Sequence, residues 1–344
     1  MKILGIETSC DETSASVVEN GKKILSNIIL SQIDIHKEFN GVVPELASRN
    51  HLKTIHQVIN ESLKRANLSW NEIDAIAVTQ EPGLMGSLLI GLTVAKTLAF
   101  CKKKPLIPIN HLMGHVYSAN LEHDIEFPFI GLIVSGGHTL LTIWKDWKNY
   151  EIAGSTIDDA VGEAFDKVAK LLDLGYPGGP KINQMAKKGT PSIDFPLVIL
   201  NYDKDRYNFS YSGLKTAVVY YIQRNQGCSK ENLCASFQKK AIDVLFRKTK
   251  LICEDKKINR VVVAGGVAAN SYLRELFDKS SLEVYIPSIK LCTDNAAMIA
   301  GLAYHQLCDL DLNVLKKIDA KDKFISKELL KKLRSSNEKY KTPF

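Results

Sequence analysis

The most constraining feature of this sequence is an order of segments that occurs twice. In the first half, three short strand-like runs precede a long helix expected over 44–67, a buried strand, a helix expected over 84–101 and a last short strand. The five strand-like runs are KILGIE, SASVVE, KILSNIIL, IDAIAVT and PLIPI. The Asn20-Gly21 pair before the third run is strong hairpin chemistry. Helical spacing over 44–67 is shown by Leu52, Ile55, Val58, Ile59 and Leu63.

The second half repeats this order with additional helices. The runs FIGLIVS, TLLTIW and YEIAGS precede several helices, after which the strands RVVVAGG and LEVYIP are each followed by a helix. A repeated β-β-β-α-β-α order that mixes hairpin strands with parallel crossovers predicts an α/β protein. We expect two lobes around a nucleotide cleft. The first comprises residues 1–125 with about 295–320, the second comprises residues 126–294 with the inserted helices, and 321–344 form a basic tail.

Matching polar turns follow the first strand of each half. The segment TSCDETS (8–14) has this place in the first half, and SGGHT (135–139) has it in the second. Glycines let backbone N–H groups approach an anion. A tight hairpin that needs positive φ is the simpler explanation of a Gly-Gly pair alone, but the match between the two turns favours an anion site. Asp11 and Glu12 are poor partners for phosphate, so we assign them to general-base catalysis or to positioning a metal-bound water.

Two more glycine segments lie in the second half. The strand that ends at Gly265-Gly266 is followed by a helix from Asn270, whose side chain has two possible roles, capping that helix or bonding a ligand. The segment YPGGP (176–180) is explained by a helix-breaking loop, and Asp166 by a solvated position on an amphipathic helix. The sequence contains neither GxGxxG nor a P-loop motif, which disfavours those nucleotide-binding folds.

The sharpest chemical signal is the histidine pair of NHLMGH. His111 and His115 are four residues apart, and this spacing places both rings on one face of a helix. The expected third ligand is a carboxylate, for which Asp294 is the candidate. Two histidines and one carboxylate favour Fe(II) among the common metals, with zinc as an alternative. A metallopeptidase of the HExxH type is disfavoured, because Leu112 stands where the glutamate base belongs.

Charge and composition set weaker limits. The net charge of +7 is concentrated in residues 320–344, which hold eight Lys or Arg against three Asp or Glu. We interpret this segment as a solvated tail, with weak attraction for RNA as the alternative. The seven cysteines include no C-x-x-C pair, no apolar run reaches the ~18 residues of a membrane span, and polar residues follow KILGI directly. These features predict a cytoplasmic protein that is not exported.

Together these segments resemble the TsaD/Gcp/Kae family, whose members are tRNA N6-adenosine threonylcarbamoyltransferases and were once described as O-sialoglycoprotein endopeptidases. The motifs follow one another over residues 5–300: GIETSCDETSA, HLMGH, IVSGGHT, AFDKVAKLL, YPGGP, FSYSGLKTA, AGGVAAN and CTDNAAMIA. The resemblance implies the ASKHA fold of actin, sugar kinases and Hsp70. It implies one Fe(2+) per subunit at His111, His115 and Asp294. It also implies that the substrate nucleotide contacts Val134, Ser135, Gly136, Gly137, His138, Asp166, Gly179 and Asn270.

The implied reaction moves a threonylcarbamoyl group from threonylcarbamoyl-AMP to N6 of the adenosine 3′ of the anticodon (position 37), in tRNAs that read codons beginning with A. The metal would polarise the donor carbonyl, the turn at 135–137 would hold the phosphate or the oxyanion, and Asp11 or Glu12 would accept the amine proton. Asn183 stands where many members carry an acidic residue, so we expect no charged contact from it.

The implied partners are tRNA, the donor or ATP/ADP, a paralogous TsaB-like subunit and a TsaE-like P-loop ATPase, and no membrane. The main alternative is an ASKHA-type ATPase or small-molecule kinase, which would use the same glycine turns but needs no histidine pair. A nucleotide-binding regulatory scaffold is another. We expect the helix over 44–67 to pack on its own sheet, with partner docking as the alternative. We expect Lys215 to be ordinary surface charge, with tRNA contact as the alternative.

Overall fold

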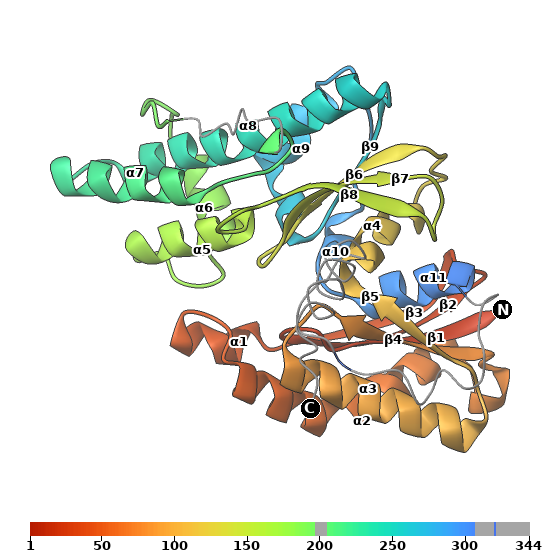
Figure 1. Ribbon diagram of the computed structural model, residues 1–344. Coiled ribbons are helices and arrows are strands. Elements are labelled where there is room, and N and C mark those ends of the chain that lie inside the picture. The colour runs from red at the N-terminus through yellow and green to blue at the C-terminus, as the bar shows by residue number, and fades with distance from the viewer. Residues whose placement is uncertain (197–204, 307–319, 321–344) are drawn as a thin grey trace, which may run out of the picture.

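Two five-stranded mixed sheets, one from each half of the chain, form the framework of the molecule (Figure 1). The computed structural model describes residues 1–196, 205–306 and 320. The first sheet has the order β3-β2-β1-β4-β5. Its strands are β1 (Lys2–Glu7), β2 (Glu12–Glu19), β3 (Lys23–Ser31), β4 (Ala75–Glu81) and β5 (Leu106–Asn110). Strands β1, β2 and β3 pair antiparallel, whereas β4 and β5 extend the sheet in parallel with β1.

The second sheet repeats this arrangement strand for strand. Its order is β10-β9-β6-β7-β8, so the first, second and third strands of the half again form a meander, and the fourth pairs in parallel with the first. Its strands are β6 (Phe129–Val134), β7 (Thr139–Trp144), β8 (Tyr150–Ser155), β9 (Arg260–Ala264) and β10 (Glu283–Tyr285). The predicted duplication and the predicted α/β class are therefore confirmed, with five strands in each sheet.

Helices of the first half cover both faces of the first sheet. On the outer face lie α2 (Pro44–Ala66) and α3 (Met85–Lys102), preceded by the short α1 (Ile33–His36), which the sequence did not predict (Figure 1). The α2 face that packs inward contains His51, Ile55, Val58, Ile59 and Leu63. Leu52 was assigned to this face, but its side chain is 63% exposed, because a helix turns its neighbour His51 inward instead. One residue of rotation, about 100°, separates the two positions.

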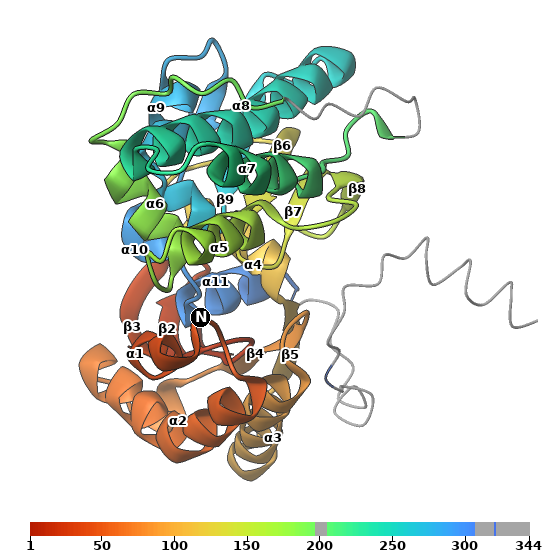
Figure 2. The same cartoon turned by 90° about the vertical axis from the view of Figure 1, so that its left-hand side faces the viewer.

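Between the two sheets lie α4 (His111–Asn120) and α11 (Ala296–Gln306), as both views show (Figures 1 and 2). Helix α4 contacts β5 of the first sheet and β6 and β9 of the second. Residues 296–303 of α11 are all buried, as expected for a helix that is apolar on every side. It packs on β1, where a Cβ at Gly5 would come within 2.4 Å of the Ala296 carbonyl oxygen. The chain thus returns to the first sheet after completing the second.

The helices of the second half, the inserted ones among them, form a block on the far side of the second sheet (Figure 2). They are α5 (Val161–Leu171), α6 (Gly178–Ala186), α7 (Ser212–Arg224), α8 (Lys230–Lys256) and α9 (Ser271–Asp278), followed by the short α10 (Ile289–Cys292). Their apolar faces share one core with β6, β7 and β9. The predicted lobe boundaries stay a prediction, and the predicted tail at 321–344 lies outside the described residues.

Helix α3 reaches the length that the sequence analysis found in no apolar run. Among the described residues it alone is long and apolar enough to cross a membrane by length and composition. It packs against α2 and β4, and Leu88, Leu92 and Ala95 are buried in the core of the first half. About a third of this helix is buried, on the side that faces the first sheet.

Candidate active site

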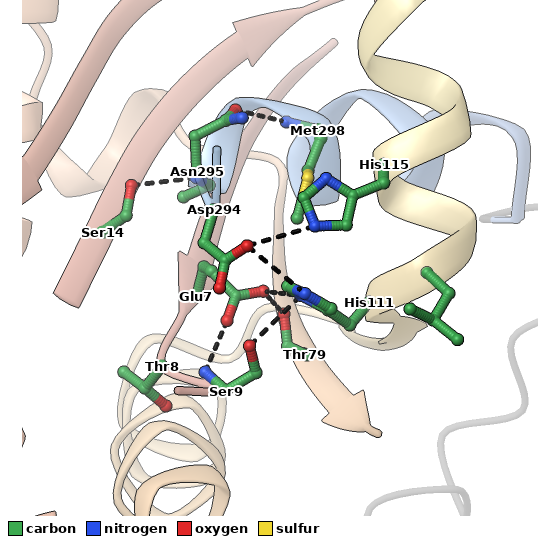
Figure 3. Close-up of polar contacts among 12 residues, drawn as sticks. Glu7, Thr8, Ser9, Ser14, Thr79, His111, His115, Asp294, Asn295 and Met298 are labelled. Atoms are coloured by element: carbon green, nitrogen blue, oxygen red, sulfur yellow. Dashed lines mark hydrogen bonds and ion pairs between the residues drawn. The ribbon is translucent and has the colours of Figure 1, made fainter. Parts of the chain in front are cut away.

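The two predicted histidine ligands lie on the first turns of α4, between the sheets (Figure 3). The side chain of Asn110 starts this helix, because its Oδ1 accepts hydrogen bonds from the backbone N–H groups of Leu112 (3.0 Å) and Met113 (3.2 Å). His111 and His115 consequently share one helix face, with ring centroids 4.6 Å apart. Both are buried, at 7% and 0% exposure.

Asp294 reaches the same point from the loop between α10 and α11. Its Oδ1 lies 3.1 Å from His115 Nε2 and 3.5 Å from His111 Nε2. This loop is fastened to the first sheet, since the Ala296 backbone N–H donates to Ser14 Oγ at 2.9 Å. The structure therefore brings the three predicted ligands together, with one ligand atom from each within 4.8 Å of the others.

The charges around these ligands favour a cation. Burial alone would raise the pKa of Asp294, but His111 and His115 outweigh it and hold that pKa far below its ordinary value. Burial alone would lower the pKa of His111, but Glu7 and Asp294 outweigh it and raise that pKa well above its ordinary value. The buried carboxylate of Glu7 and the half-buried carboxylate of Asp294 beside one imidazole favour positive charge, supplied either by a doubly protonated His111 or by a divalent ion.

The donor set fits a metal ion of the kind expected. Two imidazole nitrogens and one carboxylate oxygen converge, which suits Fe(II) or zinc. Within the described part of the chain, Nδ1 of His115 is buried without a hydrogen-bond partner. The other ring nitrogen, Nε2, lies 3.1 Å from Asp294 Oδ1. The ring is therefore already oriented with the nitrogen that would bind the ion toward the other two ligands.

The turn after β1 is buried and acidic. Asp11 is 7% exposed, and its backbone carbonyl accepts from the Gln32 N–H at 3.0 Å. Glu12 begins β2, and its Oε1 accepts from Ser31 Oγ at 3.0 Å. Burial, together with the nearby carboxylates of Asp294 and Asp11, raises the pKa of Glu12 well above its ordinary value. The charge of Asp294 thus affects the pKa of Glu12. Among the described residues, neither predicted catalytic acid has a hydrogen bond to a metal ligand.

His51 is a residue of this site that sequence reasoning missed. From α2 it donates through Nε2 to the Cys10 carbonyl (2.9 Å), and its Nδ1 accepts from Thr13 Oγ1 (2.8 Å). Burial lowers its pKa, which keeps the ring neutral and able to do both. The sequence analysis gave it no role. Its place four residues before Ile55 on the buried stripe of α2 is the signal that would have found it.

The matching turn after β6 is open. The backbone N–H of Ser135 donates to the His138 carbonyl (2.9 Å), and the His138 N–H donates to Ser135 Oγ (3.1 Å). Neither Gly136 nor Gly137 has a φ in the left-handed region, and an added Cβ at either would meet no atom within 4 Å. The hairpin explanation, that these glycines serve positive φ, is therefore wrong. Val134 ends β6 with its side chain fully buried.

In each of the other two glycine pairs, the two glycines have different surroundings. Gly178 packs against Asp166, whose Oδ1 accepts its N–H at 2.7 Å. Gly265 has φ +95° and would clash with the Val134 carbonyl at 2.4 Å if it carried a Cβ. Gly179 and Gly266, the second members, have neither a left-handed φ nor an atom within 4 Å of an added Cβ. Fold constraints explain the first member of each pair and leave the second unexplained.

Asp166 and Asn270 make structural contacts. Asn270 caps α9, its Oδ1 accepting from the Tyr272 N–H (3.0 Å) and the Leu273 N–H (3.2 Å), while its Nδ2 donates to Gln238 Oε1 (2.8 Å). Asp166 orders the start of α6 through Gly178. The carboxyls of Asp11 and Asp166 both raise the pKa of Tyr176, after burial, which is the largest cause.

Asn183 and Lys215 are also engaged within the protein. Asn183 Oδ1 accepts from Ser271 Oγ at 2.8 Å. Lys215 Nζ donates to Asp159 Oδ2 at 2.8 Å, in an ion pair that also includes Lys167. These contacts account for both side chains without a ligand.

Comparisons with known proteins agree on one family. The model of the TsaD family, tRNA N6-adenosine threonylcarbamoyltransferase, matches residues 23–301. A protein of that name from Brachyspira hyodysenteriae is 54% identical over 311 residues, covering 89% of this chain and 91% of its own. Another from Staphylococcus haemolyticus is 52% identical over 333 residues, covering 93% and 97%.

Solved structures with low sequence identity share the fold. Component A of the Acidaminococcus fermentans (R)-2-hydroxyglutaryl-CoA dehydratase has a TM-score of 0.55 at 14% identity, covering 90% of this chain and all of its own. Full-length HypF has a TM-score of 0.61 at 17% identity, covering 90% of this chain and 47% of its own. Both have the ASKHA fold, and the prediction of that fold is confirmed.

Proposed function

Because this chain belongs to the TsaD family of tRNA N6-adenosine threonylcarbamoyltransferases, we propose that it transfers a threonylcarbamoyl group from threonylcarbamoyl-AMP to N6 of the adenosine 3′ of the tRNA anticodon. The enzyme is a transferase that modifies tRNA. The observation that carries the proposed chemistry is the convergence of His111, His115 and Asp294 beside the acidic turn. These ligands come from two segments 179 residues apart.

The metal-binding residues would be His111, His115 and Asp294, and Fe(2+) is the ion that we propose. Such an ion supplies Lewis-acid polarisation of a carbonyl when bound. The chain itself contributes the two imidazole nitrogens and one carboxylate oxygen, held between the sheets by α4 and by the loop before α11.

We assign the donor nucleotide to the open glycines. At positions 136, 137, 179 and 266, neither φ nor packing requires a glycine. Close approach of a ligand is the physical reason that we propose for these glycines. Backbone N–H groups at Gly136 and Gly137 are suited to the phosphate of the donor or to the oxyanion that develops on its carbonyl. We propose that Val134, Ser135, His138, Asp166 and Asn270 shape the nucleotide site.

The proton of the attacking amine is assigned to Glu12, with Asp11 as its neighbour. As the N6–carbon bond forms and the bond from the carbonyl carbon to the AMP oxygen breaks, one amine proton must leave. A carboxylate whose pKa is raised by burial and by adjacent carboxylates is a better base near neutral pH than an ordinary glutamate. AMP departs with the phosphate charge that the turn at 135–137 would hold.

The experiment that tests this function follows the modified base. Purified protein, a TsaB-like subunit and a TsaE-like ATPase are incubated with threonylcarbamoyl-AMP and unmodified tRNA that reads a codon beginning with A. Digestion and mass spectrometry should reveal threonylcarbamoyladenosine. A protein with Asp294→Ala serves as the matched control. Absence of the modified nucleoside with wild-type protein, or equal amounts with the control, would contradict the proposal. We propose a cytoplasmic location, where this substrate is found.

A further inference from the structure

Glu7 is a buried carboxylate to which neither the family resemblance nor the mechanism above gives a role. It is the last residue of β1 and is 0% exposed (Figure 3). A carboxylate buried this completely is costly unless each oxygen accepts hydrogen bonds. Its contacts therefore show what the protein retains it for.

Every contact of the Glu7 carboxylate is with a donor. Oε1 accepts from the Ser9 backbone N–H at 2.5 Å. Oε2 accepts from Thr79 Oγ1 at 2.5 Å and lies 2.9 Å from His111 Nδ1. A carboxylate has no proton to give in this arrangement, so Nδ1 of His111 is the donor. These bonds join the end of β1, the end of β4 and the start of α4.

Nδ1 of His111 also lies 3.2 Å from Ser9 Oγ, a group that can accept or donate. The shorter bond to the Glu7 carboxylate, which only accepts, therefore decides which nitrogen of His111 is available to a metal. A neutral imidazole has one N–H and one lone pair, and a metal binds only the lone pair. With the proton on Nδ1, the lone pair is on Nε2, the atom that faces Asp294 at 3.5 Å. His115 differs, because its Nδ1 is buried without a partner in the described part of the chain.

We propose that Glu7 is a positioning residue for the metal centre: it fixes the orientation and the Nε2-ligating tautomer of His111 through the Nδ1 hydrogen bond, while Thr79 and Ser9 fix Glu7. The inference rests on the proposed metal site at His111, His115 and Asp294. Outer-sphere partners of ligating histidines typically contribute 10–100-fold to metal affinity.

Glu7→Gln is the informative variant, since it conserves shape and removes only one acceptor. The amide of the substituted side chain can lie in two orientations. If the amide oxygen faces His111 and Thr79, the amide NH₂ faces the Ser9 backbone N–H, so that two donors oppose each other. If its oxygen faces Ser9, its NH₂ donates to Nδ1 and forces the proton onto Nε2, the wrong tautomer for binding. Neither orientation reproduces the native network.

The test measures Co(2+) binding to the metal-free full-length protein, by competition with a chromophoric chelator and by the visible absorption of the bound ion. We expect Glu7→Gln to weaken binding ~10–100-fold and Glu7→Asp, which keeps the carboxylate, to recover part of the loss. Asp158→Asn is the matched control: it makes the same chemical change in a carboxylate that bonds Ser210, Tyr211 and Ser212 and not His111, so its affinity should be unchanged. Wild-type affinity of Glu7→Gln would overturn the proposal.

A second measurement needs no variant that might fail to fold. In the Zn(2+)-loaded wild-type protein, 15N-edited NMR should show a slowly exchanging, downfield Nδ1 proton on His111. A His111 ring with no proton on Nδ1 would overturn the proposal. Thr79→Val should weaken Co(2+) binding about tenfold, the lower end of the contribution of a hydrogen bond to a charged group. The underlying site is tested separately: unchanged Co(2+) affinity of His111→Ala would refute the metal centre itself, whereas a loss there with no loss in Glu7→Gln would refute only the role of Glu7.

Discussion

The turns after β1 and after β6 have the same place in two repeats of one topology, yet they have opposite properties. The first, residues 7–12, is buried or nearly so, carries three carboxyl groups and is held by hydrogen bonds from α2, β4 and the segment after β3. The second, residues 135–138, has two exposed glycines with open space around them and is closed by two bonds of its own. The duplication thus produced the same turn twice, and the two copies differ in burial and in charge.

The difference teaches how the work of the site is divided. A turn that orients charged groups must be rigid, and rigidity requires that each polar atom be satisfied. A turn that receives an anion needs free N–H groups and no side chains in the way. The acidic turn, held by hydrogen bonds from α2, β4 and the segment after β3, is suited to orienting charged groups, and the open glycine turn is suited to receiving an anion.

The largest expected effect comes from removing a metal ligand while the glycine turn is left unchanged. Asp294→Ala removes a predicted ligand, so Co(2+) affinity and transfer should each fall by more than ~100-fold, since loss of an outer-sphere partner already reaches that value. Gly136→Val should leave Co(2+) affinity unchanged, because nothing within 4 Å meets its Cβ. Both are measured by metal competition and by the tRNA modification assay. Loss of the ion in Gly136→Val would show that the two turns are not separate in function.

The next effect concerns the glycine side. Gly136→Val should fold with an unchanged Tm, yet transfer should fall about 100-fold if the donor is displaced by an ångström. Gly265→Ala is the contrasting variant: its φ of +95° and the Val134 carbonyl at 2.4 Å predict a lowered Tm. Thermal unfolding and the dependence of rate on donor concentration distinguish the two. A normal rate in Gly136→Val would remove the case for a ligand at this turn.

Glu12→Gln tests the acidic turn as a source of base catalysis. We expect the turnover rate to fall by ~10²–10³, within the range for loss of a general base, and the acidic limb of the pH–rate profile to disappear. Co(2+) binding should persist. A retained acidic limb would assign the base elsewhere, with Asp11→Asn as the variant to examine next.

The same substitution has a predicted effect on stability. Because burial and nearby carboxylates raise the pKa of Glu12 in the folded state, the protonated form is favoured there. Its contribution to stability is complete below the ordinary value of 4.5 and is lost as pH rises through the raised folded value. Metal-free Glu12→Gln should therefore unfold at a higher temperature than wild type at neutral pH, and the difference should vanish below pH 4.5. The reverse trend would contradict the assigned direction.

The smallest expected effect sharpens the contrast in rigidity. His51→Asn loses the Nε2 donor to the Cys10 carbonyl, and the rate should fall about 3- to 10-fold, the worth of one hydrogen bond. His51→Gln keeps a donor at that position and should recover most of the rate. Since burial lowers the pKa of His51 beneath 6.5, wild type should lose stability as pH falls through that lowered value, and His51→Gln should lose less. Equal rates for both variants would show that the hydrogen bond from His51 does not contribute to the reaction.

Local patterns predicted most of the fold, because apolar periodicity and turn chemistry act over a few residues. The strands and long helices agree with their predicted spans to within a few residues at the ends. Four-residue α1 is too short to show a period, and Leu52 was misplaced because a spacing rule does not fix the rotation of a helix. The histidine pair could be recognised since four residues span one turn.

Long-range partners could not be predicted in this way. Glu7 and His111 are 104 residues apart, and no spacing connects the end of a strand to the start of a helix. Asp294 was joined to the histidines through the family resemblance and the need for a carboxylate. The φ angles of Gly136 and Gly137 could not be predicted, because Gly-Gly is compatible both with a strained turn and with a ligand cradle. Only coordinates separate those two cases.

The return of α11 to the first sheet has a consequence for biosynthesis. Both histidines leave the ribosome long before Asp294, and at roughly 5–20 residues per second the delay is roughly 10–40 s. During that interval the first half lacks the helix that fills the face of β1 and the carboxylate that completes the donor set. A nascent chain would thus hold an unfinished, weakly chelating imidazole pair, and capture of a metal ion by the full donor set would be deferred until Asp294 has been synthesised.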